Sequence, residues 1–135
     1  MEAIFQDEVF YITGSSGGIG FAAAKLCIEK GATVVITGRD AGNLKNAEAE
    51  LLKISPKVIA HNVDVSNELV IIESLNEVYK SCGRIDGLVN NAPSIHTGKI
   101  TDLSLSAWKT NFKANLDAVF LATKTVLPWM IEAKQ

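Results

Sequence analysis

The chain has 135 residues, of which 47% are hydrophobic and 21% are charged, and its formal net charge is −2. This predicts one domain, residues 1–135, with a buried core. A net charge this small gives no electrostatic reason to expect binding to a nucleic acid or a membrane surface. No apolar stretch approaches the length of a transmembrane helix. Residues 1–8 lack the pattern of a signal peptide, and the two cysteines form no C-x-x-C pair, so we expect a soluble, cytoplasmic protein.

Strand and helix signals alternate along the chain. Short β-branched or apolar runs predict strands over 9–12, 33–37, 57–61 and 85–90. Between them, apolar residues at helical spacing predict helices over 19–30 (with Gly31 as the stop), from Leu44 to Ile54, after Ser66 as the N-cap, and from Ser104 to Gln135. The apolar face expected for the last, long helix is Leu105, Trp108, Phe112, Leu116, Val119, Phe120, Thr123, Val126, Leu127 and Met130.

Strands alternating with helices of this length predict an α/β fold: a Rossmann-type, doubly wound parallel sheet with helices on both faces. Ligands of such sheets bind beyond the carboxyl ends of the strands. Polar residues follow each predicted strand there, and they are Thr13, Arg39, Asp40, Asn62, Asp64, Asn90 and Asn91. Each alone is typical of a turn, but together they favour one extended ligand across that rim.

The stretch from Thr13 to Gly20 joins the first predicted strand to the first helix. Its glycines follow T-G-x-x-x-G-x-G, which differs from the G-x-G-x-x-G fingerprint. A helix N-terminus offers unpaired N–H groups and a partial positive charge to a phosphate. Gly14 would make the tight turn, Gly18 would admit the phosphate, and Gly20 would let the helix pack closely. A flexible turn is the alternative on these residues alone.

Four stretches stand out as motifs, and they are Thr13–Gly20, Asn62–Ser66, Asn90–Ala92 and Asn115–Phe120. In this order they resemble motifs of the N-terminal half of a classical short-chain dehydrogenase/reductase. The stretch Thr13–Gly20 is similar to that family's cofactor glycine motif, and Asn62-Val63-Asp64-Val65-Ser66 resembles its adenine-binding segment. Asn90-Asn91-Ala92 matches the N-N-A-G motif up to its last residue. Asn115-Leu116-x-x-Val119-Phe120 resembles the long-helix segment with the asparagine of the catalytic tetrad. The resemblance implies an oxidoreductase that transfers hydride between NADP(H) and a carbonyl or alcohol substrate.

The resemblance also implies roles for single residues. The Thr13 hydroxyl would tie the glycine turn to the end of the fourth strand, and Asp64 would accept a hydrogen bond from adenine. Asn115 would interrupt the long helix and hold a water in the proton relay, whereas without the motif it is equally typical of a solvent-facing residue. The implied cofactor-binding residues are Thr13, Gly14, Ser15, Ser16, Gly18, Ile19, Gly20, Arg39, Asp64, Val65, Asn90 and Ala92.

Arg39 bears on the choice of cofactor. Enzymes that take NAD usually place an acid near the end of the second strand for the ribose 2′-OH. Here Thr37-Gly38-Arg39 places a guanidinium where a 2′-phosphate would sit, and Asp40 is expected to cap the next helix instead. The sequence therefore favours NADP over NAD without excluding NAD. No metal is expected, because His61 and His96 have no ligand-like spacing.

The sequence departs from the family pattern in two ways. Pro93 stands where the N-N-A-G motif has glycine, and the only tyrosines, Tyr11 and Tyr79, are not followed by a lysine four residues on. Because the family's catalytic Ser and Tyr-x-x-x-Lys lie beyond the long helix, the chain is expected to be the incomplete, cofactor-binding half of an enzyme. The alternative is a non-catalytic nucleotide-binding or interaction module. The apolar surplus of the long helix, Ser104–Gln135, further predicts a homo-oligomer.

Overall fold

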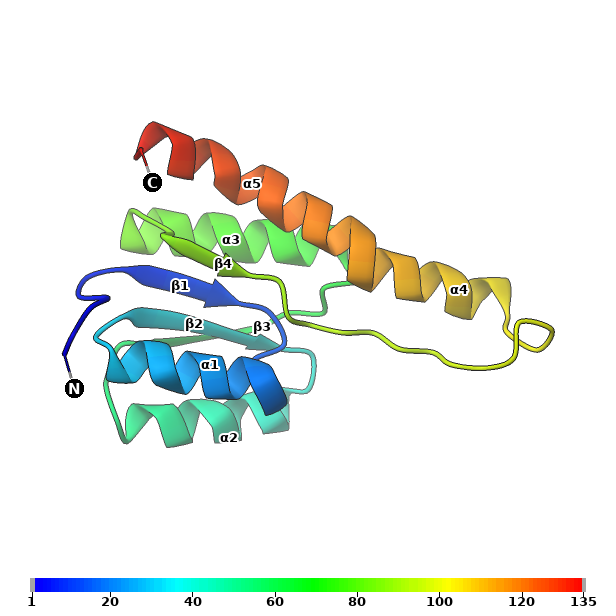
Figure 1. Cartoon of the computed structure of the whole chain (residues 1–135), viewed down its shortest axis with the longest axis horizontal. Helices are drawn as coiled ribbons and strands as arrows, with labels where there is room; N and C mark the ends of the chain where they lie inside the picture. The colour runs from blue at the N-terminus through cyan, green and yellow to red at the C-terminus, as the bar shows by residue number, and fades with distance from the viewer. Residues whose placement is uncertain (1, 135) are drawn as a thin grey trace.

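The computed structural model describes residues 2–134, so Met1 and Gln135 lie outside the description. Strands and helices alternate as the sequence predicts (Figure 1). The strands are β1 (Val9–Ile12), β2 (Thr33–Gly38), β3 (Val58–Asn62) and β4 (Gly87–Val89). The helices are α1 (Gly18–Glu29), α2 (Ala41–Leu52), α3 (Glu68–Cys82), α4 (Leu105–Phe112), the π-helical turn η1 (Lys113–Asp117) and α5 (Ala118–Glu132).

All strand pairs in the sheet are parallel, in the order β3-β2-β1-β4. The helices α1 and α2 cover one face, and α3 and α5 cover the other (Figure 1). The strand order reverses between β1 and β4, which is where ligands of doubly wound sheets bind. The predicted fold class is therefore confirmed, and its switch point lies beside the glycine stretch that follows β1.

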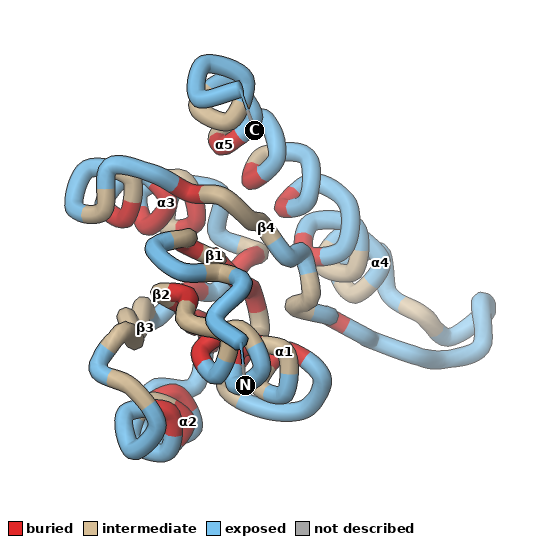
Figure 2. Tube along the Cα trace, turned by 60° about the vertical axis from the view of Figure 1, so that its left-hand side comes forward, coloured by how far each residue is buried: buried red, intermediate tan, exposed pale blue. Residues whose placement is uncertain are grey.

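Side chains alternate across the sheet into two cores. In β2, Val34 and Ile36 pack toward α1 and α2, whereas Val35 packs toward α3 and α5. Figure 2 shows buried positions of α1, α2 and α3 on the side that faces the sheet, and those of α5 on the side toward α3. Because β2 is covered on both faces, all its residues after Thr33 are buried. The part of the rim at the carboxyl end of β2 therefore follows a strand that is buried in the centre of the sheet.

Helix ends differ from the predictions at two places. Ser66 is not the cap of α3: Asn67 is, and its side chain accepts from the Val70 N–H. The Ser66 hydroxyl instead donates to Asp64. Helix α2 ends at Leu52, so Ile54 lies beyond it and is exposed. The predicted cap at Asp40 is confirmed, because its carboxylate accepts from the Asn43 N–H at 2.7 Å.

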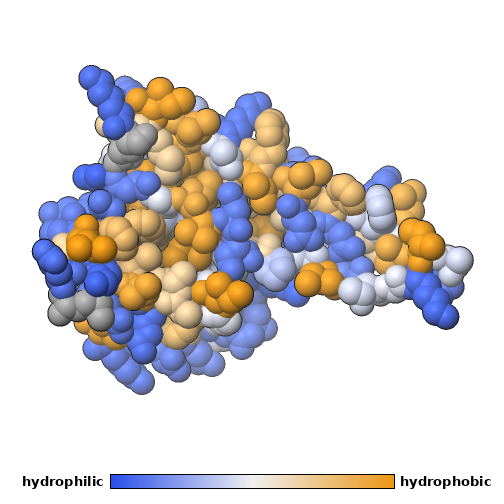
Figure 3. All heavy atoms as spheres, in the orientation of Figure 1, coloured by the Kyte–Doolittle hydropathy of each residue, from blue (hydrophilic) through white to orange (hydrophobic). Residues whose placement is uncertain are grey.

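The long helical segment, α4 to α5, buries a different face from the one predicted. Small residues at a spacing of four, Ala114, Ala118 and Ala122, are buried with Val126 against the α3 side of the core. The larger apolar residues lie outside, and Figure 3 shows hydrophobic residues at the surface along α5 and α4. Two members of the predicted face do meet the core, since Val126 is buried and Met130 packs against it. The exposed members are Leu105, Trp108, Phe112, Leu116, Val119, Phe120, Thr123 and Leu127. Alanine at the contact lets the helix backbones approach closely, which a pattern based on bulk hydrophobicity does not reveal.

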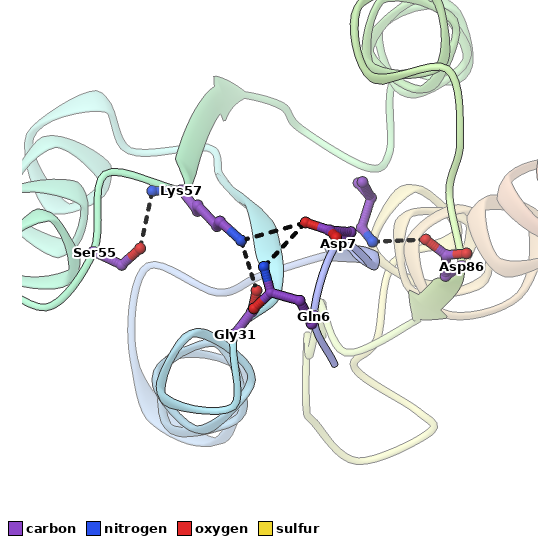
Figure 4. A network of polar contacts seen from close by, with 7 residues as sticks. Gln6, Asp7, Gly31, Ser55, Lys57 and Asp86 are labelled. Carbon is purple, nitrogen blue, oxygen red and sulfur yellow. Dashed lines mark hydrogen bonds and ion pairs between the residues drawn. The ribbon is translucent and has the colours of Figure 1, made fainter. Parts of the chain in front are cut away.

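The amino ends of the strands are fastened by a separate polar network, on the side away from the rim (Figure 4). The Lys57 ammonium donates to the Gly31 carbonyl at 3.1 Å and lies 3.8 Å from Asp7. The backbone N–H of Val9 donates to Asp86 at 2.7 Å, which ties β1 to the turn before β4. This network fixes the ends of the sheet that carry no predicted site residue.

Candidate functional site

The three predicted glycines of the first turn have distinct geometries. Gly14 and Gly18 have φ angles of +61° and +57°, which favour glycine. A Cβ on Gly18 would meet no atom within 4 Å, so the backbone there is open to a ligand. A Cβ on Gly20 would lie 2.5 Å from the Asn91 amide nitrogen and 2.7 Å from the Gly14 carbonyl oxygen. Gly20 therefore permits the close packing predicted for it, and Gly18 leaves the helix start accessible.

The Thr13 hydroxyl connects the glycine turn to the end of β4, as predicted. It accepts hydrogen bonds from the backbone N–H groups of Asn91 and Ala92, each at 2.9 Å, and donates toward the Val89 carbonyl at 3.4 Å. The Asn91 side chain adds two donations, to the carbonyls of Thr13 and Gly14 at 3.1 and 3.0 Å. The sequence placed Asn91 among the polar residues of the rim, although not among the cofactor-binding residues.

Ser15 joins β1 to β2 rather than facing the rim. It is buried, and its hydroxyl donates to the Ile12 carbonyl at 2.7 Å while accepting from the Thr37 N–H at 2.9 Å. Thr37, which the sequence did not assign to the site, accepts from the Gly14 N–H at 3.3 Å. The predicted contact of Ser15 with a cofactor is therefore an indirect one: its side chain shapes the turn.

The end of β2 is arranged around Arg39. The amide of Asn62 donates to the carbonyls of Gly38 and Arg39, at 2.8 and 3.2 Å, which fixes the backbone beneath the Arg39 side chain. A Cβ on Gly38 would lie 2.7 Å from the Ser16 hydroxyl. The glycine loop and the turn that carries Arg39 are thus in direct contact, and Arg39 lines the same cavity as Ser16 and Gly17.

Asp64 is held as a carboxylate at the end of β3. Its side chain accepts from the Ser66 hydroxyl at 2.7 Å and from the Ser66 N–H at 2.9 Å. The hydroxyl hydrogen bond is the largest cause that lowers the pKa of Asp64, and the Arg39 charge acts in the same direction. One carboxylate oxygen is used by Ser66, so the second remains an acceptor for a donor group such as an adenine amino group.

A cavity of about 530 Å³ runs along the rim from Arg39 to His96. Six of the predicted residues line it: Gly14, Ser16, Arg39, Asp64, Val65 and Ala92. The other predicted residues do not. Thr13 and Ser15 are buried beneath it, Gly18, Ile19 and Gly20 form the start of α1, and the Asn90 amide lies 3.5 Å from the Thr123 hydroxyl of α5. Residues that the sequence reasoning did not assign to the site complete the lining, among them Gly17, Ser94, His96 and Thr110.

Asn115 lies in the π-helical turn η1, as its predicted interruption of the long helix requires. Its amide is engaged by the loop after β4: it accepts from the Ser94 N–H at 3.2 Å and donates to the Ser94 carbonyl at 2.6 Å. Residue 115 is exposed, as the solvent-facing alternative requires, but its amide is also hydrogen-bonded to this loop. The assignment of Asn115 to catalysis remains a prediction.

Pro93 fits the loop without loss of a needed donor. The N–H groups that hold this loop on Thr13 belong to Asn91 and Ala92, and the next pair of bonds is made by Ser94. Proline at position 93 therefore removes no hydrogen bond of this network. Pro93 itself lines the cavity, so it shapes the wall where the motif has glycine.

The chain matches known proteins along nearly its whole length. The model of the short chain dehydrogenase family matches residues 8–135. An uncharacterised oxidoreductase of Staphylococcus aureus (strain N315) is 31% identical over 129 residues, which cover 96% of this chain and 55% of that protein. The meso-2,3-butanediol dehydrogenase of Serratia marcescens is 32% identical over 130 residues, which cover 96% of this chain and 51% of that protein.

A crystal structure of a metagenomic short-chain oxidoreductase in complex with NADP has a TM-score of 0.92 to this chain at 32% identity, covering 97% of this chain and 60% of that one. The chain therefore belongs to the short chain dehydrogenase family, which confirms the predicted resemblance. It spans about half the length of the curated relatives it matches.

Membrane-spanning helices and metal clusters are both absent from residues 2–134. No helix among them is long and apolar enough to cross a membrane. No group of three or more His, Cys, Asp or Glu side chains in the described chain is arranged to hold a metal ion.

Proposed function

We propose that the chain is the cofactor-binding part of an oxidoreductase that transfers hydride between NADP(H) and a carbonyl or alcohol substrate. The observation that carries the proposal is that one cavity joins the glycine loop, Arg39 and the loop after β4. A dinucleotide is an elongated ligand, and it binds such sheets across the strand-order reversal. The cofactor supplies the hydride, and the residues of this chain bind and orient it.

The residues present fit a dinucleotide. The open backbone at Gly17 and Gly18 begins α1, so a pyrophosphate there meets free N–H groups and no side chain. Arg39 lies beside the loop and offers a fork of donors to a 2′-phosphate. Asp64 offers a carboxylate oxygen to the adenine. The related metagenomic structure that contains NADP supports the choice of this cofactor.

Asn115 acts on the substrate end of the cavity in this proposal. Its amide makes one hydrogen bond through each polar atom to Ser94, so the side chain orients the loop, and its remaining N–H, its remaining lone pair and its backbone are offered to a water of a proton relay. The π-helical turn supports this role, since a π-turn changes the pairing of the helix carbonyls at that point.

A glycine variant tests the binding site. Gly17 has φ −172°, and a Cβ added to it would meet no atom within 4 Å, so Gly17→Val is compatible with the fold but fills the phosphate cradle. We expect it to abolish NADPH binding in calorimetry while the melting temperature is kept. Gly98→Ala, whose Cβ would make only an ordinary contact outside the cavity, is the matched control. Undiminished NADPH binding by Gly17→Val, or no NADPH binding by the unmodified chain, would contradict the proposed site.

A non-catalytic nucleotide-binding module is the second candidate. It differs from the first in its proton donor: within these residues neither Tyr11 nor Tyr79 has a lysine four residues on, and Tyr11 is buried, so any such donor comes from elsewhere. Proton transfer to a carbonyl oxygen needs a positioned acid, which contributes about 10²–10⁴-fold in rate. A polypeptide of these 135 residues alone is expected to bind NADPH without oxidising it in the presence of carbonyl compounds. Turnover that Asp64→Ala abolishes would show that another group of this chain supplies the proton.

We also propose that the chain self-associates through the outer face of the long helical segment. Leu116, Phe120 and Ile131 are 57%, 61% and 66% exposed there. Burying one such side chain contributes about 1.5–3 kcal/mol, so covering several favours association. Light scattering at micromolar concentration is expected to give a mass above that of one chain, and a monodisperse monomer would contradict this.

A cytoplasmic location is part of the proposal, and the free thiols of Cys27 and Cys82 are consistent with it.

A further inference from the structure

Asn111 of α4 makes a pair of hydrogen bonds that the motifs do not predict. Its side-chain oxygen accepts from the backbone N–H of His96 at 2.8 Å, and its amide donates to the His96 carbonyl at 2.9 Å. Both bonds go to the backbone of one residue, so the pairing resembles that of two neighbouring strands. The His96 side chain takes no part in it.

The same pairing occurs one helical turn further on, between Asn115 and Ser94. Four residues of an α-helix rise by about 6 Å, and two residues of extended chain span about 6.6 Å. The spacing between Asn111 and Asn115 therefore equals the spacing between the loop residues that they bond, His96 and Ser94. The loop runs antiparallel to the helix. Four hydrogen bonds hold the loop in an extended path along the helix.

This pairing forms the end wall of the cavity. The loop contributes Pro93, Ser94 and His96 to the lining, and the helix contributes Thr110 and Ala114. The distance between these two sets is set by the asparagine side chains between them. Figure 1 shows this loop and α4 extending together past the carboxyl ends of the strands. In the described chain, the two asparagines are the residues whose side chains bond the loop at positions 94–96.

We propose that Asn111 is a positioning residue for the nicotinamide half of the cofactor. This inference rests on the proposed function. The adenosine half takes the end of the cavity at Arg39 and Asp64, so the other half of a dinucleotide lies over β4, against the wall that Asn111 holds. Loss of Asn111 frees the loop from residue 95 onward, and the wall at His96 is no longer fixed. The adenosine end, which has its own supports at Asn62 and Ser66, is unaffected.

The test compares two ligands. NADPH fills both ends of the cavity, whereas adenosine 2′,5′-bisphosphate fills only the Arg39 end. We expect Asn111→Ala to weaken NADPH binding by about tenfold, the effect of losing one or two net hydrogen bonds, and to leave the bisphosphate affinity unchanged. Asn76→Ala is the control, because Asn76 lies on the exposed side of α3 and its amide donates to the Ile72 carbonyl of the same helix. Equal losses for both ligands, or none for either, would overturn the role of Asn111.

A second pair of variants separates backbone from side chain. Because Asn111 bonds the backbone of residue 96, His96→Ala keeps the pairing, whereas His96→Pro removes the N–H that donates to Asn111. His96→Pro is expected to lose more NADPH affinity than His96→Ala, which serves as its reference because both variants remove the imidazole that lines the cavity. If His96→Ala causes the same loss, the imidazole and not the pairing is responsible. Failure of the unmodified chain to bind adenosine 2′,5′-bisphosphate would instead refute the proposed function, so the two failures are distinguishable.

Discussion

Gly14 and Ala92 lie so close together that a Cβ on Gly14 would be 2.6 Å from the Ala92 Cα. The contact joins the turn after β1 to the loop after β4, which are 78 positions apart in the chain. Its closeness, and not only the φ of +61°, is what requires glycine at position 14. This contact fixes the position of the turn after β1 relative to the loop after β4.

Replacement of Gly14 tests this contact. Gly14→Ala forces the two loops apart and places alanine at a positive φ, so we expect the free energy of unfolding to fall by about 2–4 kcal/mol. Gly17→Ala, at an extended φ with no atom within 4 Å, is expected to change it by less than about 1 kcal/mol. Denaturant unfolding of both variants measures the difference. Equal stability of the two would contradict the close approach.

Thr13 offers a second test of the rim. Thr13→Val keeps the shape of the side chain but leaves the N–H groups of Asn91 and Ala92 without their acceptor. Each unsatisfied group costs about 1–3 kcal/mol, so a loss of about 2 kcal/mol or more is expected in chemical denaturation. Thr13→Ser keeps the hydroxyl and is expected to lose less than half of that. A serine variant as unstable as the valine variant would show that the methyl group, not the hydroxyl, matters.

Tyr11 predicts how stability depends on pH. Burial raises the pKa of Tyr11 to about 12, and its hydrogen bond with Ser74 offsets part of that rise. The phenol of the unfolded chain has a pKa of about 10. The neutral phenol of Tyr11 therefore stabilises the folded chain fully below about pH 10. This contribution to the free energy of unfolding is lost as the pH rises from about 10 to about 12, with a slope of about 1.4 kcal/mol per pH unit. Tyr11→Phe should show a correspondingly shallower loss over that range, and identical slopes in both proteins would refute the assignment.

The long helical segment gives a matched pair of variants on its two faces. Ala122 is buried, so Ala122→Leu overpacks the contact with α3 and is expected to lower the free energy of unfolding by about 1–3 kcal/mol. Phe120→Ser, on the exposed face, is expected to change the stability of the single chain little but to reduce the mass seen by light scattering. If Phe120→Ser is the more destabilising of the two, the predicted large apolar face is the buried one after all.

The sequence was informative where local patterns and physics agree. The alternation of strands and helices, the glycine turn, the Thr13 tie and the cap at Asp40 all follow from local chemistry, and the structure contains each of them. The apolar face of the long helix was predicted correctly at Val126 and Met130 and wrongly at most other positions, because large hydrophobic side chains dominate such a pattern while the buried contact uses Ala114, Ala118 and Ala122. The cap at Ser66 was wrong because α3 begins at Glu68 and the Asn67 side chain caps it, whereas the Ser66 hydroxyl donates to Asp64.

Part of the site depends on contacts between distant residues, which no spacing rule reveals. The bonds of Asn91 to Thr13 and Gly14 and the pairing of Asn111 with His96 join segments that only the fold brings together. The spacing of four between Asn111 and Asn115 was visible, but its meaning depends on an extended loop alongside the helix. The lining by Ser94, His96 and Thr110 was beyond reach for the same reason.

The central claim, NADP bound with its 2′-phosphate at Arg39, is tested most directly by titrating the chain with NADPH and NADH in calorimetry. NADPH is expected to bind more tightly, and Arg39→Ala should remove most of the difference, about 1.5–3 kcal/mol for a charge-assisted contact. Arg39→Lys, which keeps the charge but loses the fork of donors, should retain part of it. Equal affinities for NADPH and NADH in the unmodified chain, or a preference for NADPH that survives in Arg39→Ala, would contradict the account.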